Sequence, residues 1–492
     1  MSVDMRSVCD IYQSKSVLIT GSTGSLGKIL VEKLLRCCPG IVHIYLLVRP
    51  IHQSSTSASQ RLSNFLKSPL FNKLRNDDAH VFNKIVLVEG DLKLPNIGIS
   101  ASDRISLMNN VSVVFHCAAD MKFDAELKDI TSVNVFGTRR LLQLCKQMKK
   151  LEAFVYVSTL YSTCHNAVIE ECVPLIPPFN GIADWNERDE DEVVHLTPQE
   201  LLDQWPNTYT FSKAVTEIML DGYKHLIPIS IVRPSIILST LREPMPGWID
   251  NYYGPTLMIC NSSLGLKRSL HGYLQGVANF IPTDLVVNVI ICAAWKTVQQ
   301  NSPVMKIYNC CTGKRNPITW GQFGKECLKN SKKYACKNML RYPHTTYSTS
   351  RFVHRIISAT QEYLVVYIHA MTNGNFKLVR IQKRLTRLWE LVSFFSNREW
   401  IIDDNNVVEL NDQLSQMDKK IFCIDMGIID WPTYLENYVK GIRVHLLKDS
   451  MDSIKEGRAR LNVLYWKEIL IQLFLVAFIT ASVYVISLIM FL

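Results

Sequence analysis

The chain has 492 residues, of which 48% are hydrophobic and 20% are charged, and its formal net charge is +10. This length exceeds what one hydrophobic core normally covers, so a main domain with an appendage is expected, and the composition excludes a largely disordered chain. The 14 cysteines form no CxxC pair or zinc-binding spacing, which favours a reducing compartment, and the positive charge suits an anionic membrane or a phosphate-rich ligand. No aromatic and basic module accompanies it, so no nucleic-acid partner is expected.

The first strong pattern is "SKSVLITGSTGSLGKILVEKLL", residues 14–35. A short apolar run ends in three glycines spaced by three, and a helical apolar pattern follows. Gly21 permits a tight turn, Gly24 allows close backbone approach, and Gly27 lets the helix pack against a sheet. A strand that turns into a helix in this way directs backbone N–H groups at a pyrophosphate, although glycines also occur at such turns for geometric reasons alone.

Short apolar runs alternate with helical patterns over the first 320 residues. Runs that are apolar on both faces and separated by helices predict a doubly wound parallel sheet, an α/β fold of the Rossmann type. We therefore expect an NADP-binding catalytic domain over residues 1–320. The predicted strands include residues 17–19, 44–49, 84–90, 111–119, 154–159, 229–235 and 306–312.

The tip of the second predicted strand selects between dinucleotides. An acid at this position binds the ribose of NAD, whereas an arginine accepts the 2′-phosphate of NADP. The strand ends in Arg49 with no acid nearby, so NADPH is the predicted cofactor, unless a local carboxylate holds Arg49. Asp91 is placed either to contact the adenine or to cap the following turn. Ala118 is small, which lets the fourth predicted strand pass close to the cofactor. The predicted cofactor-binding set is completed by Thr23, Leu26, Leu92, Tyr209 and Lys213.

A tyrosine and a lysine four residues apart indicate the reaction. On a helix this spacing puts Tyr209 and Lys213, in "NTYTFSKAVTEIML", on one face. A hydride that reaches a carbonyl carbon leaves charge on the oxygen, and a nearby acid must supply a proton. We expect the Lys213 ammonium to lower the pKa of the Tyr209 phenol. Thr159, at the end of a predicted strand, completes the predicted catalytic set.

The hydrophobic pattern changes after about residue 345, where longer helical periodicities predict a helical domain over 345–448. One of these helices has a basic face that contacts either lipid headgroups or plain solvent. This face comprises Arg380, Lys383, Arg384 and Arg387.

The last 24 residues, 469–492, carry no charge. Such a stretch predicts a transmembrane anchor, and the alternative is a buried core helix. Basic residues precede the stretch and none follows it, which places the bulk of the protein in the cytosol. The organelle stays open between endoplasmic reticulum and peroxisome.

Several stretches resemble the extended short-chain dehydrogenase/reductases: "VLITGSTGSLG", "VFHCAA", "VNVFGTRRLL", "FVYVSTLYS" and "YTFSKA". "PGWIDNYYGP", "NREWIIDDNN" and "IDWPTYLENYVKGIR" resemble the fatty acyl-CoA reductases more narrowly. This resemblance implies reduction of long-chain acyl-CoA by NADPH to a primary alcohol, with Tyr209, Lys213 and Thr159 in catalytic positions. The basic residues that often follow Arg49 in related chains are missing from "IHQSSTSASQR", so Arg49 is expected to bind the 2′-phosphate alone.

Alternatives remain at this stage. The scaffold also suits a membrane-bound hydroxysteroid dehydrogenase or a sugar-nucleotide modifier, since a fold does not fix a substrate. A noncatalytic, NADPH-binding membrane adaptor is a third reading. Trp248, Tyr252 and Tyr253 are candidate walls of an acyl tunnel or simply core aromatics. Chain-length preference, an aldehyde or alcohol product and the oligomeric state stay open.

Overall fold

The chain folds into two compact units, each assembled from three separate segments. The computed structural model describes residues 7–51, 56–174, 190–192, 197, 199–300, 304–360, 371 and 377–491. Unit 1 comprises Met1–Pro246, Asn279–Pro317 and Glu399–Ile429, and unit 2 comprises Gly247–Ala278, Ile318–Arg398 and Asp430–Leu492. The predicted domains, over residues 1–320, 345–448 and 469–492, are contiguous, whereas each unit consists of three separate segments. The chain instead returns to unit 1 after each excursion, because its late segments complete the sheet and cover it.

The centre of unit 1 is a parallel sheet, which confirms the predicted α/β fold. Within the described residues it has seven strands in the order β11-β7-β5-β4-β1-β2-β3. All of the predicted runs form strands of this sheet, and the run of five buried residues in β1 shows why: both of its faces are covered. The strands are β1 (Ser16–Thr20), β2 (His43–Val48), β3 (Ile85–Glu89), β4 (Val111–His116), β5 (Ala153–Val157), β7 (Ile229–Pro234) and β11 (Lys306–Cys310).

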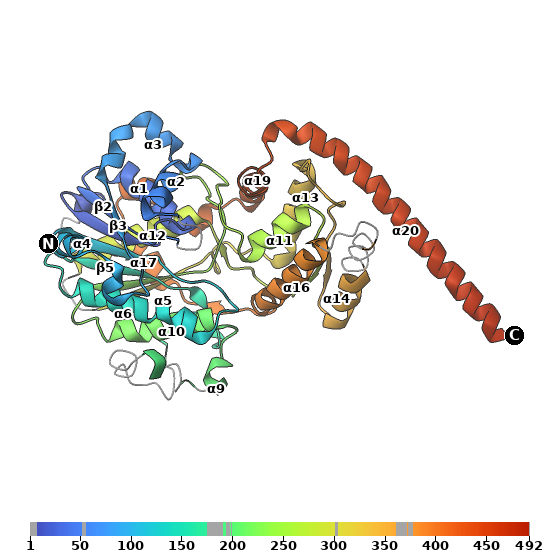
Figure 1. Cartoon of the computed structure of the whole chain (residues 1–492), viewed down its shortest axis with the longest axis horizontal. Coiled ribbons are helices and arrows are strands. Elements are labelled where there is room, and N and C mark those ends of the chain that lie inside the picture. Colours follow the sequence, from blue (N-terminus) through green and yellow to red (C-terminus); the bar gives the residue numbers. More distant parts are fainter. Residues whose placement is uncertain are drawn as a thin grey trace. The chain divides into compact units, whose positions relative to one another are not determined.

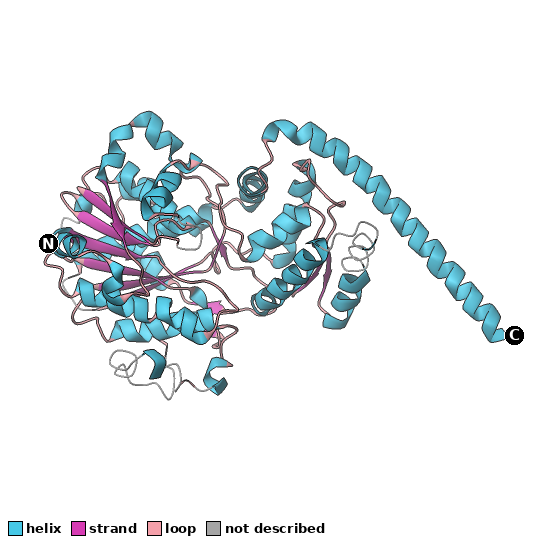
Figure 2. Cartoon of the chain, in the orientation of Figure 1, coloured by secondary structure: helices cyan, strands magenta, loops and turns pink. Residues whose placement is uncertain are grey.

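Helices cover both faces of this sheet (Figures 1 and 2). On one face α1 (Ser25–Cys37) packs against α12 (Thr283–Gln299), and on the other α10 (Thr208–Asp221) packs against α5 (Leu127–Asn134). The strand order reverses direction between β1 and β4, so the crevice at the carboxyl ends of these strands is where such a sheet binds its ligand. The other helices of unit 1 include α2 (Ala58–Leu66), α3 (Asn72–Asp77), α4 (Ala101–Asn110), α6 (Phe136–Cys145), α9 (Gln199–Leu202), α17 (Asn405–Gln413) and α18 (Gln416–Ile421).

Short strand pairs fasten the late segments of unit 1 to the rest. In one of them β13 (Ile401–Ile402) pairs in parallel with β6 (Val168–Ile169), and in another β10 (Phe280–Ile281) pairs with β8 (Ile236–Ile237). The β13/β6 pair joins the backbone of residues more than 200 positions apart.

Unit 2 is mainly helical. Its helices pack around a short parallel pair, β9 (Ser269–His271) and β12 (Thr346–Ser348). The helices include α11 (Gly254–Ser263), α13 (Trp320–Lys333), α14 (Arg351–Ile357), α16 (Lys377–Ser396), α19 (Trp431–Gly441) and α20 (Ile454–Phe491).

The predicted transmembrane helix over 469–492 falls in α20. Among the described residues, none of the helices combines the length and the apolar character needed to cross a bilayer. The structure therefore does not show the predicted anchor. Many side chains in the last part of α20, and Leu492 entirely, lie outside the described residues.

Candidate functional site

The glycine turn after β1 forms a bare backbone cradle. Gly21 has a φ of +71°, and a Cβ there would lie 2.6 Å from the backbone nitrogen of Ala118. A Cβ on Gly27 would lie 2.3 Å from the carbonyl oxygen of Gly21. Gly24 begins α1 as its N-cap and donates its N–H to Gly21 O at 3.0 Å, and Leu26 lies half-buried in the first turn of α1. The glycine N-cap leaves the N-terminus of α1 without a capping side chain, which fits a dinucleotide pyrophosphate.

Two arginines meet beyond the end of β2. Arg49 is 55% exposed, and its Nε lies 3.9 Å from Asp91 Oδ2. A carboxylate therefore lies near Arg49, as the alternative allowed, but the ion pair is long and exposed. Arg61, on α2, donates to Thr23 Oγ1 at 2.9 Å and to the carbonyl oxygen of Arg49. Burial, together with the charge of Arg49, lowers the pKa of Arg61. Two guanidinium groups therefore lie near the end of β2, because α2 brings Arg61 back to Arg49 from twelve residues further along the chain.

Asp91 and Leu92 form a turn after β3. Asp91 Oδ1 accepts the backbone N–H of Lys93 at 3.0 Å, so the turn-capping role that the sequence left open is realised. Leu92 is buried, and its carbonyl oxygen accepts from Arg140 Nη1 at 2.9 Å. The turn is thus rigid, and the second oxygen of Asp91 faces Arg49.

A buried histidine fixes the end of β4 against the glycine turn. His116 Nδ1 lies 2.6 Å from Thr20 Oγ1, and its Nε2 lies 2.8 Å from Thr138 Oγ1. Burial, with a smaller contribution from the charge of Lys213, lowers the pKa of His116 to about 3, so the ring is neutral. Thr20 Oγ1 also accepts the N–H of Ala118 at 3.2 Å, which holds Ala118 beside Gly21.

Lys213 and Tyr209 occupy the start of α10, which Asn207 caps by accepting the N–H of Thr210 at 2.9 Å. Lys213 is 2% exposed, donates to the carbonyl oxygen of Val157 at 2.7 Å, and lies 4.5 Å from the centre of the Tyr156 ring. Burial lowers the pKa of Lys213 to about 7. The ammonium therefore lies at the carboxyl end of β5, the strand that leads into Thr159.

Tyr209 is half-buried, and its ring stacks on Phe123 with centroids 5.8 Å apart. Thr159 Oγ1 accepts the N–H of Tyr161 at 3.4 Å. In the part of the chain that the structure describes, no hydrogen bond joins the Tyr209 hydroxyl to Lys213 or Thr159. Burial raises the pKa of Tyr209, which is opposite to the direction expected from an adjacent ammonium. The Lys213 ammonium instead donates to the carbonyl oxygen of Val157.

A buried ion pair lies one helical turn beyond Lys213 and was missed in the sequence. Glu217 and Arg233 are both fully buried, and Arg233 donates Nε at 2.9 Å and Nη2 at 2.5 Å to the two oxygens of Glu217. Ser158 also donates to Glu217 at 2.5 Å. The charge of Glu217 raises the pKa of Lys213 and so opposes the effect of burial. The available signal was an arginine inside the apolar strand "ISIVRP".

Asn134, within "VNVFGT", is a second residue whose role the sequence analysis did not assign. It is 1% exposed, donates Nδ2 to Ser212 Oγ at 2.9 Å, and accepts the N–H of Asp120 at 2.8 Å. Ser212 in turn donates to the carbonyl oxygen of Tyr209 at 2.7 Å. Asn134 therefore joins the loop after β4 to the first turn of α10. The signal that could have predicted this role was a polar asparagine within the helical pattern of "VNVFGT".

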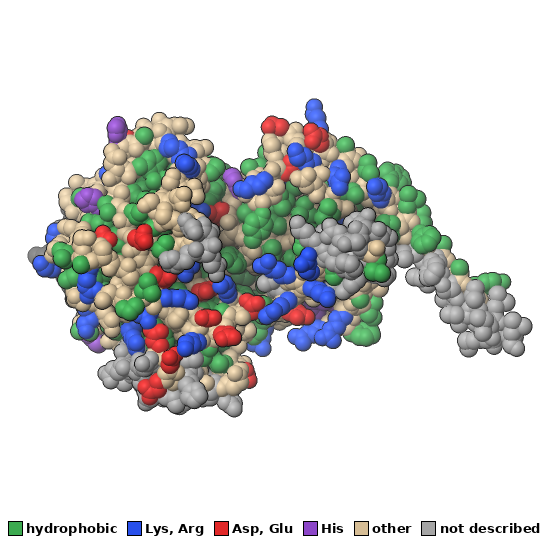
Figure 3. Space-filling view, viewed as in Figure 1, with side chains coloured by type: hydrophobic (Ala, Val, Ile, Leu, Met, Phe, Trp, Pro, Cys, Tyr) green, Lys and Arg blue, Asp and Glu red, His purple; other side chains and the backbone are tan. Residues whose placement is uncertain are grey.

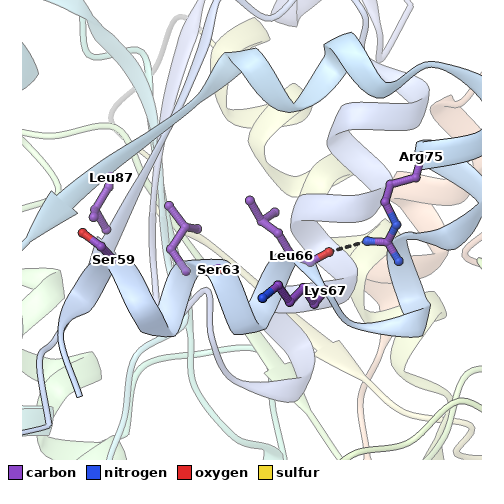
Figure 4. Close-up of a pocket in the computed structure, with 7 residues that line it drawn as sticks. Ser59, Ser63, Leu66, Lys67, Arg75 and Leu87 are labelled. Carbon is purple, nitrogen blue, oxygen red and sulfur yellow. Dashed lines mark hydrogen bonds between the residues drawn. The ribbon is translucent and has the colours of Figure 1, made fainter. Parts of the chain in front are cut away.

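One described hollow lies away from the predicted catalytic residues. It is an open groove of about 750 Å³ between α2 and β3, and none of the predicted site residues lines it (Figure 4). Arg75 closes one end by donating to the carbonyl oxygen of Leu66. The lining comprises Ser59, Leu62, Ser63, Leu66, Lys67, Arg75 and Leu87.

A smaller, mostly apolar hollow lies inside unit 2, between α11, α13 and the β9/β12 pair. Its lining includes Met258, Ile259, Leu270, Trp320 and Phe323. Of the aromatics predicted as tunnel walls, Trp248 is buried, whereas Tyr252 and Tyr253 are 46% and 59% exposed. The buried apolar surface of unit 2 is therefore supplied mainly by other residues.

Known proteins match this chain along most of its length. Two family models described as male sterility protein match residues 19–290 and 353–449. Fatty acyl-CoA reductase 1 of Xenopus laevis is 34% identical over 466 residues, 94% of this chain and 90% of that protein. Fatty acyl-CoA reductase 2 of Bos taurus is 34% identical over 465 residues, covering 93% and 90%. The reductase domain of a nonribosomal peptide synthetase from Mycobacterium tuberculosis has a TM-score of 0.61 at 18% identity, covering 88% and 92%, which shows a shared fold.

Proposed function

This chain belongs to the fatty acyl-CoA reductase family, and from that premise we propose that it reduces long-chain fatty acyl-CoA to the primary alcohol with release of CoA. The observation that carries the proposal is the buried Lys213 ammonium at the end of β5, on the same helix as Tyr209. A noncatalytic nucleotide-binding protein does not need a buried cation there.

The residues of this chain supply the proton chemistry. Tyr209 protonates the substrate oxygen as charge develops on it, and the hydroxyl of Thr159 polarises the same oxygen. Lys213 stabilises the phenolate that Tyr209 leaves behind, which requires its ammonium to turn from the Val157 carbonyl toward the phenol. The thioester is reduced first, the hemithioacetal expels CoA, and the aldehyde is reduced in the second step.

The described residues fit a nicotinamide dinucleotide. A Cβ at Gly21 or Gly27 would collide with neighbouring backbone atoms, so the tight turn that presents the N-terminus of α1 to a pyrophosphate requires glycine at both positions. When bound, this cofactor supplies the hydride. We propose NADPH in preference to NADH, because Arg49 and Arg61 converge beside Thr23, where two guanidinium groups suit a 2′-phosphate. Leu26, Asp91, Leu92 and Ala118 form the remaining predicted contacts.

The proposal extends to the acyl chain and to the membrane. The hollow of unit 2 measures about 40 Å³, well below the roughly 300–1,000 Å³ of typical ligand pockets, so binding of a long alkyl chain there requires this hollow to open. The uncharged end of α20 holds the protein on a membrane, with the bulk of the chain facing the cytosol at the endoplasmic reticulum or the peroxisome. Support comes from exposed apolar side chains on α20, namely Trp466, Leu470, Leu473 and Phe474.

The test is NADPH consumption with C16 and C18 acyl-CoA, with mass spectrometry of the products. Tyr209→Phe is expected to lower kcat by about 10²- to 10⁴-fold, the usual contribution of a general acid. Tyr45→Phe is the matched control, because it removes a hydroxyl bonded to Ser106 at 3.2 Å and remote from the catalytic residues. Equal rates for Tyr209→Phe and wild type would remove Tyr209 from the mechanism. NADPH binding without turnover of either acyl-CoA would favour the noncatalytic adaptor.

A further inference from the structure

The outer surface of unit 2 carries an unusual mixture of exposed apolar and basic side chains on two helices. Figure 3 shows lysine and arginine side chains gathered over α14 and α16. We call this the α14–α16 surface. It consists of Arg351, Phe352, Val353, Arg355 and Ile356 from α14 and Arg380, Lys383 and Arg384 from α16.

The apolar part of this surface points away from the unit. Phe352 is 72% exposed, and Val353 and Ile356 are 44% and 49% exposed. The opposite side of α14 is fastened inward, since His354 Nδ1 lies 2.7 Å from Ser269 Oγ on β9. His354 is half-buried, whereas Phe352, Val353 and Ile356 on the same helix are exposed, and such a grouping of exposed apolar side chains indicates an interaction site.

The basic part of the surface has no acidic partners among the residues that the structure describes. Within the described residues, none of the five cations Arg351, Arg355, Arg380, Lys383 and Arg384 makes an ion pair with an acidic side chain. Neither helix supplies acids to balance them, because α14 has none and α16 has only Glu390. The buried side of α16 includes Val379, Leu385, Val392 and Phe395, so its exposed basic face is a stable feature. Uncompensated cations beside exposed apolar side chains match an anionic bilayer surface.

The position of the surface adds a third observation. Glu468 is the last charged residue of the chain, and it pairs with Arg268 at 2.8 Å and with Arg341 at 3.6 Å. Arg268 immediately precedes β9, the strand whose Ser269 holds α14. The uncharged part of α20 therefore begins next to the strand on which α14 is mounted.

We propose that the α14–α16 surface docks on the headgroup layer of an anionic membrane, beside the point where α20 leaves unit 2. The cations contact lipid phosphates, and Phe352, Val353 and Ile356 enter the boundary between headgroups and acyl chains. This docking rests on the membrane attachment proposed above. It fixes the orientation of unit 2, with its apolar hollow, against the bilayer from which an insoluble acyl chain arrives.

The test places an environment-sensitive fluorophore at single cysteines in the full-length chain. In the background, serine replaces the exposed Cys172 and the four partly exposed cysteines, Cys9, Cys37, Cys117 and Cys423. Labels are placed at Phe352→Cys in the surface, Leu473→Cys in α20 and Leu226→Cys, an exposed position in unit 1. The protein is reconstituted in phosphatidylcholine vesicles with and without phosphatidylserine, and quenching by nitroxide-labelled lipids is measured.

We expect quenching at 352 in phosphatidylserine vesicles and none at 226. Each cation near an anionic surface contributes about fivefold to the docking equilibrium. Arg380→Gln, Lys383→Gln and Arg384→Gln together should lower the docked fraction at 352 at least about tenfold, with quenching at 473 unchanged. The matched control neutralises three exposed lysines of unit 1, Lys146, Lys149 and Lys150, and should change nothing.

Each other outcome has a defined meaning. Quenching at 473 without quenching at 352 overturns the docking surface and leaves the attachment by α20 standing. Absence of quenching at both positions refutes the attachment and the docking together. Quenching at 352 that is the same with and without phosphatidylserine, or with and without the triple substitution, overturns the proposal that the cations bind an anionic surface. A spectral shift at 352 without vesicles, reversed by dilution, would identify a second copy of the chain as the occupant and overturn the proposal.

Discussion

Replacement of Glu217 by glutamine tests how the interior of unit 1 supports Lys213. Glu217→Gln keeps the size of the side chain and its acceptor for Ser158, but it leaves Arg233 as a fully buried charge without its carboxylate. Removal of one partner of a buried ion pair costs about 3–5 kcal/mol. For a unit of this size the thermal midpoint should fall on the order of 5–10 °C.

The same substitution should change the pH profile, which a purely structural effect would not do. Catalysis uses the protonated form of Lys213, so activity is lost as pH rises through the pKa of this group. Burial lowers that pKa to about 7 and the charge of Glu217 raises it, so loss of the charge lowers it further. The basic limb of kcat should move to lower pH by on the order of one unit.

Controls separate these effects. Glu409→Gln removes the carboxylate of an ion pair with Lys306, where Glu409 is 50% exposed, and should cost no more than about 1 kcal/mol. The double variant Glu217→Gln/Arg233→Gln should recover part of the lost stability, because no unpaired charge remains. Thermal unfolding and kcat profiles between pH 5 and 10 supply the measurements. An unshifted basic limb together with an unchanged unfolding midpoint in Glu217→Gln would refute the reasoning.

Three further predictions concern other parts of unit 1. Gly27→Ala places a Cβ 2.3 Å from the carbonyl oxygen of Gly21, so NADPH binding measured by fluorescence titration should weaken at least about tenfold; unchanged affinity would argue against the cradle. Arg61→Ala should lower kcat/KM with NADPH about tenfold and leave that with NADH unaltered, whereas an equal loss with both would reject a 2′-phosphate contact. Burial raises the pKa of Glu171 from 4.5 to about 7, so the folded state holds this proton more tightly than the unfolded state. Its contribution to stability is present below about pH 4.5 and is lost as pH rises to about 7, and Glu171→Gln should flatten that part of the unfolding profile.

The sheet was predictable from the sequence because both faces of its strands are covered. A run such as "VSVVFH" of β4 is buried at every position, so hydrophobicity alone identifies it. The glycine turn was equally readable, since Gly21 needs positive φ and Gly27 has no room for a side chain. The division of the chain into two units could not be predicted, because a hydrophobic pattern does not show which core a late segment packs against.

Residues that act through distant partners escaped the sequence analysis. Arg61 lies on α2, twelve positions beyond Arg49 at the end of β2, and only the fold brings its guanidinium to Arg49 O and Thr23. Glu217 lies one turn after Lys213, but its partner Arg233 comes from β7. Helical spacing predicts neighbours along one helix, whereas a pairing between elements depends on topology.

The relation between Tyr209 and Lys213 shows the same limit in its chemistry. The four-residue spacing predicts that both side chains share a helix face, but their proton affinities depend on what surrounds that face. Burial raises the pKa of the Tyr209 phenol and lowers that of the Lys213 ammonium to about 7, so desolvation disfavours the charged form of each group. Burial of a phenolate beside an ammonium costs less desolvation free energy than burial of either charge alone, because the two charges attract each other. Proton release from Tyr209 should therefore depend on a charged Lys213, and Lys213→Met should lose more activity than its loss of cofactor affinity explains, as measured by single-turnover reduction at saturating NADPH.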